Sequence, residues 1–260
     1  MSKTKFISSI VKSYIFWLLI GSVVLVFSGP AFLTAICLYP YDQTRKAIHF
    51  VISGWAKTTV LVCPLMKVSI EGQEWLDPKK TYVLVSNHQS VADIIVSLHL
   101  KQSFKFIAKQ ELFWIPFLGW SMWLAGYIPL IRGNQQSGKK ALMIAKSFVE
   151  HGTSVLFFPE GTRSPDGEIH AFKFGAFKLA AETGVPVVPI VINGTYNLVP
   201  KGSRIFNRRV KVRLKVLEPR KAPGNDNVSI ERFSAEIRSD MIGALNAQRI
   251  KKEIELTSIS

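Results

Sequence analysis

The sequence predicts an α/β domain with a mixed sheet flanked by helices, preceded by an N-terminal two-helix membrane-anchoring motif. Residues 14–38 contain no charged side chain, and from residue 66 short apolar runs alternate with stretches of helical periodicity. Such alternation is typical of a layered α/β domain. We therefore expect membrane-anchoring helices at residues 1–65 and one α/β domain at residues 66–260.

The first apolar segment, residues 14–38, is long enough to insert into a membrane. As a helix it would measure about 37 Å, against roughly 30 Å for the hydrocarbon core of a bilayer. Pro30 is expected to kink this helix or to start a new turn. A cleaved signal peptide is the alternative, but the run is too long and lacks a convincing small-residue cleavage site.

The second segment, residues 42–65, mixes apolar and charged side chains. Its apolar residues recur at helical spacing and comprise Ile48, Val51, Ile52, Trp55 and Val62. The residues that interrupt them are Arg45, Lys46, His49 and Lys57. This combination favours an amphipathic helix at the membrane interface over a membrane span. A helix packed on the globular domain is the alternative.

From residue 66 onward the expected elements follow one another closely. Strands are expected at residues 67–70, 82–85, 104–108, 155–158, 187–192 and 210–217. Helices are expected at residues 92–100, 138–150, 172–183 and 229–254. Residues 210–216 alternate strictly between apolar and cationic side chains. The cationic face of that strand is expected to be solvated, to protect a sheet edge or to contact lipid headgroups.

The formal net charge of +15 favours anionic partners, such as nucleic acid, anionic lipid or an acidic acyl carrier protein. The basic residues do not cluster as in nucleic-acid motifs, and no zinc-finger or RNA-binding signature is present, so we expect no nucleic acid. Cys37 and Cys63 both lie in apolar surroundings. We expect them to be reduced rather than to form a disulfide or a metal site.

A histidine and an aspartate, His88 and Asp93, follow the strand expected at residues 82–85. They can meet if His88 lies in the loop and Asp93 in the first turn of the next helix, with Ser90 as its N-cap. The carboxylate would then fix the tautomer of a general base and stabilise its protonated form. The alternative is that Asp93 only caps the helix. No serine or cysteine is obviously placed as a nucleophile, which favours direct attack by a substrate hydroxyl.

Cationic and small polar residues near two further loops suit a phosphate group. The expected substrate phosphate-binding residues are Lys109, Arg132, Glu160, Gly161, Thr162 and Arg163. A phosphomonoester favours planar charged donors, and Arg163 lies in a Gly-containing turn whose backbone amides can approach the same anion. Glu160 is expected either to orient Arg163 or to contact a hydroxyl of the substrate. Either arginine taken by itself is more often a surface ion-pair residue.

These motifs resemble those of the glycerolipid acyltransferases. Asn87-His88 with Asp93 looks like the His-x4-Asp motif of that family, and residues 158–164 look like its second diagnostic block. The three further stretches that fit the family are residues 108–112, 126–132 and 185–190. The blocks stand in the right order over roughly residues 80–195. The 1-acyl-sn-glycerol-3-phosphate acyltransferase branch is the most similar.

The resemblance implies an O-acyltransferase of phospholipid biosynthesis. His88, held by Asp93, would deprotonate the sn-2 hydroxyl of 1-acyl-glycerol 3-phosphate (lysophosphatidate). The hydroxyl oxygen would then attack the thioester of acyl-CoA or acyl carrier protein, giving phosphatidate. Neither a metal nor a cofactor is expected beyond this thioester co-substrate. The family also implies a two-helix motif in one leaflet, with catalysis on the cytoplasmic face. We expect this to be the inner membrane, and the net charge favours anionic membrane lipids as partners.

Other interpretations stay open at this point. The acceptor can be another lysophospholipid or glycerol 3-phosphate, and outside the enzymes the alternative is a non-catalytic membrane lipid-binding protein. The His88/Asp93 pair argues against a pure binder, which has no use for a base. Residues 113–120 are rich in aromatic and apolar side chains. They are expected to line an acyl-chain groove, to pack in the core or to anchor the membrane interface.

Overall fold

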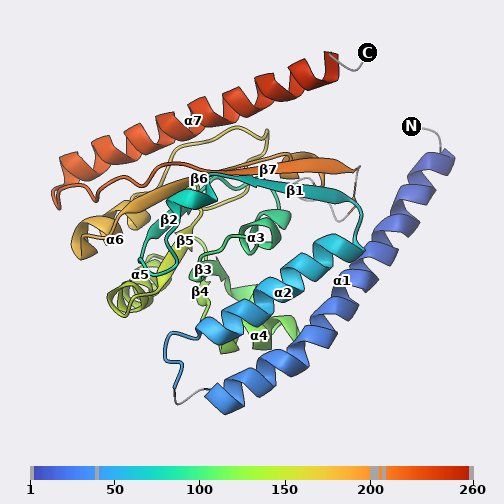
Figure 1. Cartoon of the computed structure of the whole chain (residues 1–260), viewed down its shortest axis with the longest axis horizontal. Helices are drawn as coiled ribbons and strands as arrows, with labels where there is room; N and C mark the ends of the chain where they lie inside the picture. The colour runs from blue at the N-terminus through green and yellow to red at the C-terminus, as the bar shows by residue number, and fades with distance from the viewer. Residues whose placement is uncertain (1–2, 39–40, 200–204, 207–208, 258–260) are drawn as a thin grey trace.

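The computed structural model describes residues 3–38, 41–199, 205–206 and 209–257, with side chains described between residues 10 and 250 of these. The strands are β1 (Met66–Glu71), β2 (Val83–Ser86), β3 (Phe104–Lys109), β4 (Ile128–Leu130), β5 (Ser154–Phe157), β6 (Val187–Asn193) and β7 (Val210–Val216). The α-helices are α1 (Lys3–Leu38), α2 (Lys46–Val62), α3 (Ala92–Ser97), α4 (Leu118–Leu124), α5 (Gln135–Glu150), α6 (Gly175–Thr183) and α7 (Asn227–Thr257). Short 3-10 helices are η1 (Gln73–Trp75), η2 (Gln110–Trp114) and η3 (Thr195–Asn197). Figure 1 shows the sheet between α7 on one side and the α1–α2 pair on the other.

The seven strands form one sheet in the order β1-β7-β6-β2-β5-β3-β4. Neighbouring strands are parallel except for β6 and β7, so the predicted mixed sheet is confirmed. The central strand β2 is buried on both faces, which suits its apolar composition. Because β2 and β5 are parallel neighbours, the loops that follow them meet at the same edge of the sheet. Those loops carry residues 87–91 and 158–164.

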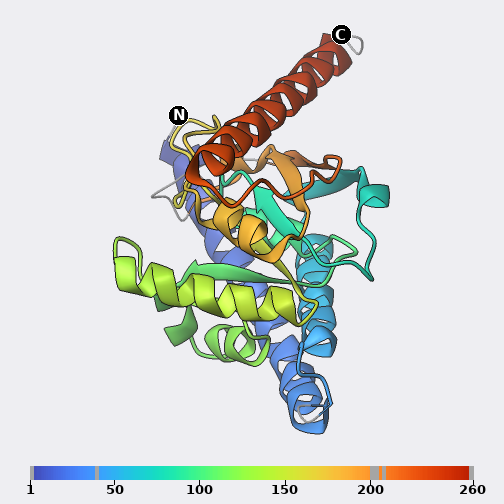
Figure 2. The ribbon, with the colours of Figure 1, turned by 90° about the vertical axis from the view of Figure 1, so that its left-hand side faces the viewer.

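Side chains on the two faces of the sheet form two separate cores. In β2, Leu84 packs with residues of α1 to α4, whereas Val83 and Val85 pack with α5, α6 and α7. Successive side chains of a strand point to opposite faces, which divides the apolar residues in this way. Figure 2 shows α7 at the top of the molecule and the C-terminal end of α1 at the bottom.

Helix α1 runs without interruption for 36 residues, and Pro30 lies inside it rather than starting a new turn. Its segment Ile10–Leu38 is the one described helix that is long and apolar enough to cross a membrane. The helix nevertheless lies along the domain. The N–H of Phe206 donates to Ser13 Oγ at 2.9 Å, and Ser28 Oγ lies 3.5 Å from Ser121 Oγ on α4.

Helix α2 packs one face on the domain. Ile48, Ile52 and Ala56 are buried in the core that the sheet shares with α1. Phe50 and Leu61 are exposed on its outer side. The alternative prediction for this segment, a helix packed on the domain, is therefore confirmed for the face that carries Ile48 and Ile52. An interfacial location of the outer face, and a domain boundary between residues 65 and 66, stay predictions.

Other elements differ from the expected ones. The sequence does not predict α4 or β4, because seven and three residues are too few to show a period. The helix expected at residues 92–100 ends at Ser97, and turns follow it. Strand β7 lies between β1 and β6, so the suggestion that it protects a sheet edge is wrong. Its Arg213 donates instead to the carbonyl of Gln248 on α7, at 3.1 Å.

Candidate active site

His88 and Asp93 meet where the chain passes from β2 into α3. The Nδ1 atom of His88 lies 2.8 Å from Oδ2 of Asp93, and that oxygen also accepts the N–H groups of Gln89 (2.6 Å) and Ser90 (2.8 Å). Asp93 is fully buried, whereas the His88 ring lines a cavity and stacks on Phe158 with 4.3 Å between ring centroids. An ionised carboxylate only accepts hydrogen bonds, so Nδ1 carries the proton. The other ring nitrogen, Nε2, is left with the lone pair of a base.

The sequence predicts Ser90 as the N-cap of α3, and this prediction is wrong. The N-cap position is Val91, and Ser90 Oγ donates to the carbonyl of Val199 at 3.3 Å. The carboxylate of Asp93 instead reaches back to the N–H groups that precede the helix. This reversed contact ties Asp93 to the same loop that carries His88, so the two side chains are held in register by the backbone.

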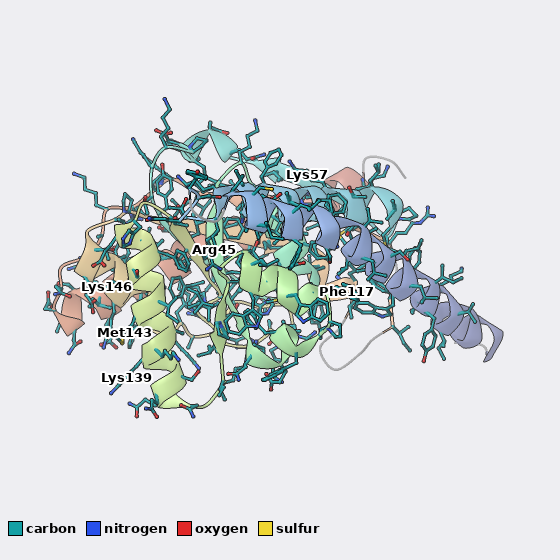
Figure 3. The ribbon with its side chains drawn as sticks, turned by 90° about the horizontal axis from the view of Figure 1, so that it is seen from below. Arg45, Lys57, Phe117, Lys139, Met143 and Lys146 are labelled. Atoms are coloured by element: carbon teal, nitrogen blue, oxygen red, sulfur yellow. The ribbon has the colours of Figure 1, made fainter. Side chains whose placement is uncertain are left out.

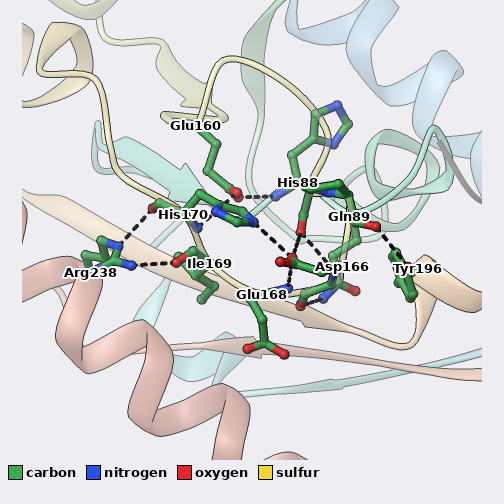
Figure 4. Close-up of polar contacts among 12 residues, drawn as sticks. His88, Gln89, Glu160, Asp166, Glu168, Ile169, His170, Tyr196 and Arg238 are labelled. Atoms are coloured by element: carbon green, nitrogen blue, oxygen red, sulfur yellow. Dashed lines mark hydrogen bonds and ion pairs between the residues drawn. The ribbon is translucent and has the colours of Figure 1, made fainter.

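The loop after β5 holds the backbone of His88 from the other side (Figure 4). Glu160 accepts the N–H of His88 through Oε1 (2.9 Å) and the N–H of His170 through Oε2 (3.2 Å). The N–H of Ser164 donates to the carbonyl of His88 at 2.7 Å. Burial raises the pKa of the Glu160 carboxyl, and the two backbone N–H groups partly offset this. Both oxygens of Glu160 therefore contact the backbone rather than Arg163.

Helix α7 braces this second loop. Arg238 donates from Nε to the carbonyl of His170 (2.8 Å) and from Nη2 to the carbonyl of Ile169 (2.7 Å). In Figure 4 the contacts form a continuous series from Arg238 through His170 and Glu160 to His88. The backbone of the candidate base is thus connected to a helix that begins more than a hundred residues later in the chain.

Three of the cations expected to bind phosphate lie around one cavity. Lys109, Arg132 and Arg163 all line it, together with Gly161. Lys109 forms an ion pair with Glu111 at 2.9 Å, with both side chains largely exposed. Arg163 makes no hydrogen bond or ion pair to another residue of the described chain. Thr162 is exposed and does not line the cavity.

Lys173, which the sequence does not single out, joins these cations. Lys173 lines the same cavity, and its Cε and Nζ lie 2.9 Å from the point where a Cβ on Gly161 would be. Gly161 has a φ of +72°, in the left-handed region that favours glycine. The backbone conformation therefore favours glycine at position 161, and a side chain there would displace the end of Lys173. A charged residue between Phe172 and Phe174, just before a helix, is the signal that sequence reasoning missed.

The cavity has a volume of about 1410 Å³ and extends from His88 along α1. Its apolar walls include Trp17, Ile20, Ile94, Leu98, Ile115 and Leu118. A cavity lined by a base, by cations and by many apolar side chains suits an amphiphile with an anionic headgroup. Of residues 113–120, Phe113 is buried in the core, Ile115 and Leu118 line the cavity, and Trp114 and Trp120 are exposed. An acyl-chain groove and a membrane interface formed by these residues stay predictions.

Comparison with known proteins agrees with this geometry. The family model described as Acyltransferase matches residues 67–193, which include His88, Asp93 and Arg163. Residues 67–193 belong to the acyltransferase family. A relative of this acyltransferase domain is the chloroplastic 1-acyl-sn-glycerol-3-phosphate acyltransferase BAT2 of Brassica napus, which is 42% identical over 76% of this chain and 56% of its own length. The 1-acyl-sn-glycerol-3-phosphate acyltransferase of Saccharomyces cerevisiae is 34% identical over 69% of this chain and 60% of its own length.

A solved structure extends the likeness beyond the acyltransferase domain. The 1-acyl-sn-glycerophosphate acyltransferase PlsC from Thermotoga maritima superposes with a TM-score of 0.78 at 29% identity, over 93% of this chain and 97% of that one. Because this superposition covers nearly the whole chain, the shared fold includes the N-terminal helices as well as the sheet. By contrast, the chain spans only about half of the length of the curated plant relatives that it matches.

The two cysteines, Cys37 and Cys63, do not line the cavity, and both are free thiols. Among the residues that the structure describes, no group of three or more His, Cys, Asp or Glu is arranged to hold a metal ion. A reaction without a metal or a resident cofactor stays a prediction.

Proposed function

We propose that this acyltransferase transfers an acyl chain from acyl-CoA or acyl carrier protein to the sn-2 hydroxyl of 1-acyl-glycerol 3-phosphate, giving phosphatidate. The observation that carries this proposal is the His88–Asp93 pair beside a cavity that is lined both by cations and by apolar side chains. Curated relatives whose names specify this acceptor support it. The thioester is a co-substrate rather than a resident cofactor.

The proposed reaction is a direct transfer in which His88 Nε2 removes the proton of the sn-2 hydroxyl. The hydroxyl oxygen attacks the thioester carbonyl, the carbon–sulfur bond breaks, and the thiolate leaves and takes up the proton from His88. Asp93 stabilises the positive imidazolium between these two proton transfers, since its carboxylate lies 2.8 Å from Nδ1. Backbone N–H groups near Gly161 are the proposed donors for the oxyanion.

The substrate is proposed to lie along the cavity with its phosphate beside the cations that line it. Arg163 offers a planar set of donors, and Arg132 and Lys173 add positive charge nearby. The acyl chains then occupy the apolar part between α1 and α3, where burial removes them from water. This placement brings the glycerol backbone, which joins phosphate and acyl chain, next to His88.

We propose that the enzyme works on the cytoplasmic face of the inner membrane, with α1 in one leaflet. A helix that crossed the bilayer would need about 20 residues clear of the domain. Contacts of Ser13 and Ser28 hold α1 against the domain, and only residues 29–38 follow them. The net charge of +15 supports a surface rich in anionic lipid. Residues 1–65 are the proposed anchor and residues 66–260 the catalytic unit.

An acceptor comparison tests this function. The purified full-length protein is given acyl-CoA with lysophosphatidate, lysophosphatidylcholine or glycerol 3-phosphate, and released thiol and lipid product are measured. We expect thiol release together with phosphatidate formation, fastest with lysophosphatidate. A preference for one of the other two acceptors would assign the reaction to that acceptor instead. Tight lipid binding without thiol release from any acceptor would support the non-catalytic alternative.

A further inference from the structure

An exposed aromatic surface lies on η2, on α4 and on the turn between them. This surface, the α4 patch, consists of Trp114, Ile115, Phe117, Trp120 and Trp123. Their side chains are between 40% and 75% exposed. The rings of Phe117 and Trp120 lie 4.9 Å apart, so the patch is partly organised by its own contacts. Large apolar side chains that are exposed together on so short a segment are typical of a surface that binds a protein or a membrane.

The backbone holds this surface in an unusual conformation. Phe117 has a φ of +64°, which is rare for a residue other than glycine. The turn is closed by the N–H of Gly119 donating to the carbonyl of Ile115 (2.7 Å) and the N–H of Ser121 donating to that of Phe117 (3.0 Å). An aromatic side chain at a position that glycine would occupy more easily points to a function for that side chain.

The patch is continuous with the apolar surface of α1. Helix α4 packs against α1, where Ser121 meets Ser28, and Val26 and Leu33 are exposed on that helix. Figure 3 shows α4 with Phe117 beside α1 on the underside of the molecule, whereas α5 with Lys139 lies apart from them. Trp and Phe favour the boundary between lipid headgroups and acyl chains, which is where this surface would lie if α1 were inserted.

We infer that the α4 patch inserts into the same lipid leaflet as α1, so that the bilayer covers it. This rests on the membrane location proposed above and not on the acyl transfer. Ile115 belongs to the patch and also lines the cavity. Docking therefore places the wall of the cavity in the leaflet, where a lipid can pass from bilayer to cavity without exposing its acyl chain to water.

The test measures the depth of single fluorescent labels on the full-length protein. In a Cys37→Ser background, with the buried Cys63 left in place, the variants Trp120→Cys and Trp114→Cys are labelled with an environment-sensitive dye. Val26→Cys on α1 reports membrane insertion itself. Trp75→Cys on η1 is the matched control, because Trp75 is 43% exposed but belongs to the segment after β1. The proteins are bound to vesicles of phosphatidylcholine and phosphatidylglycerol, with or without a nitroxide on the lipid acyl chains.

We expect blue-shifted emission and loss of fluorescence to the nitroxide at positions 120 and 114, as at position 26. The label at position 75 should keep its emission and be quenched by iodide in the water. The inference is overturned if the labels at 120 and 114 behave like the one at 75 while the label at 26 is quenched. If the label at 26 is also unquenched, the membrane location fails and the inference with it. Thiol release by the same proteins shows independently whether the proposed reaction stands.

Discussion

One carboxylate oxygen of Asp93, Oδ2, accepts three hydrogen bonds, which come from His88 Nδ1 and from the N–H groups of Gln89 and Ser90. The other oxygen, Oδ1, is buried without a partner in the described structure. The contact of Oδ2 with His88 Nδ1 places a negative charge beside the base, where it can stabilise the imidazolium.

Asp93→Asn separates the charge from the hydrogen bonds. The amide oxygen can replace Oδ2 and keep the three contacts, while the NH2 group takes the place of Oδ1. We expect a folded protein with a modest loss of thermal stability, because the buried NH2 group finds no acceptor. Without a negative charge to stabilise the imidazolium, acyl transfer should fall by about 10² or more. Circular dichroism and thiol release measure the two effects, and near-normal turnover would show that the carboxylate only caps the loop.

Arg163 can be tested through the acceptor. Arg163→Lys keeps the charge but loses the planar fork, so lysophosphatidate use should weaken, and Arg163→Ala should weaken it further, mainly through the KM for the acceptor. The comparison is with a lysophospholipid whose phosphate carries choline, measured with the same acyl-CoA. If Arg163→Ala lowered the use of both acceptors equally, Arg163 would not recognise the phosphomonoester.

At the scale of elements, α7 acts on the site through Arg238. Arg238→Ala removes two hydrogen bonds to the loop that carries Glu160, so the backbone of His88 should be held less firmly. We expect kcat to fall by roughly tenfold with little change in the KM for acyl-CoA, because misplacement of a reacting group affects the chemical step. Arg232→Ala is the matched control, since Arg232 lies on the same helix and pairs with Glu236.

Partial recovery of kcat by Arg238→Lys would support this bracing, because lysine can still donate to one of the two carbonyls. If Arg238→Ala has a lower melting temperature but a normal kcat when assayed well below that temperature, Arg238 contributes to stability and not to the chemical step.

Strand β3 contains a fully buried lysine, Lys105, whose Nζ donates to the carbonyl of Arg45 at 3.3 Å and lies 5.6 Å from the centroid of the Phe148 ring. Burial, and then the nearby charge of Arg45, lower the pKa of Lys105 from 10.5 to about 7. Between pH 10.5 and about pH 7, the Lys105 amine is therefore protonated in the unfolded chain but largely neutral in the native state. The native state is disfavoured as the pH falls from 10.5 to about 7, and no further below that.

Lys105→Met should remove this penalty. We expect the variant to be more stable than the wild type near pH 7, by about 1–3 kcal/mol after the lost hydrogen bond is counted. The difference should shrink as the pH rises toward 10.5. Urea unfolding in detergent at several pH values measures it. A difference that stays constant with pH would mean that Lys105 remains charged in the native state.

For the molecule as a whole, the sequence predicts what depends on neighbours in the chain. The strands before the two site loops are predicted because both are short apolar runs, whereas their parallel pairing, which brings the loops together, appears only in the structure. Contacts between distant residues leave no such pattern. Arg238 meets a loop 68 residues away, and Ser13 meets Phe206 across 193 residues. The hydrogen bonds of Glu160 belong to this class, which explains why the sequence could not choose between its expected roles.

Aromatic residues illustrate the same limit. In residues 113–120 the sequence shows only that the side chains are apolar, and core, cavity and surface all accept such side chains. The buried Phe113, the cavity-lining Leu118 and the exposed Trp120 are distinguished only by how η2 and α4 pack against α1. Tertiary packing, rather than composition, decides which residues remain free to meet a membrane.

The central claim is that His88 is the base of an acyl transfer to lysophosphatidate. The most direct measurement is thiol release from acyl-CoA by purified wild type and His88→Ala, with His151→Ala as the control because His151 is exposed at the end of α5. We predict that His88→Ala loses about 10² to 10⁴ in rate while its circular dichroism and vesicle binding match the wild type. His151→Ala should keep full activity. Turnover by His88→Ala close to that of the wild type would contradict the mechanism.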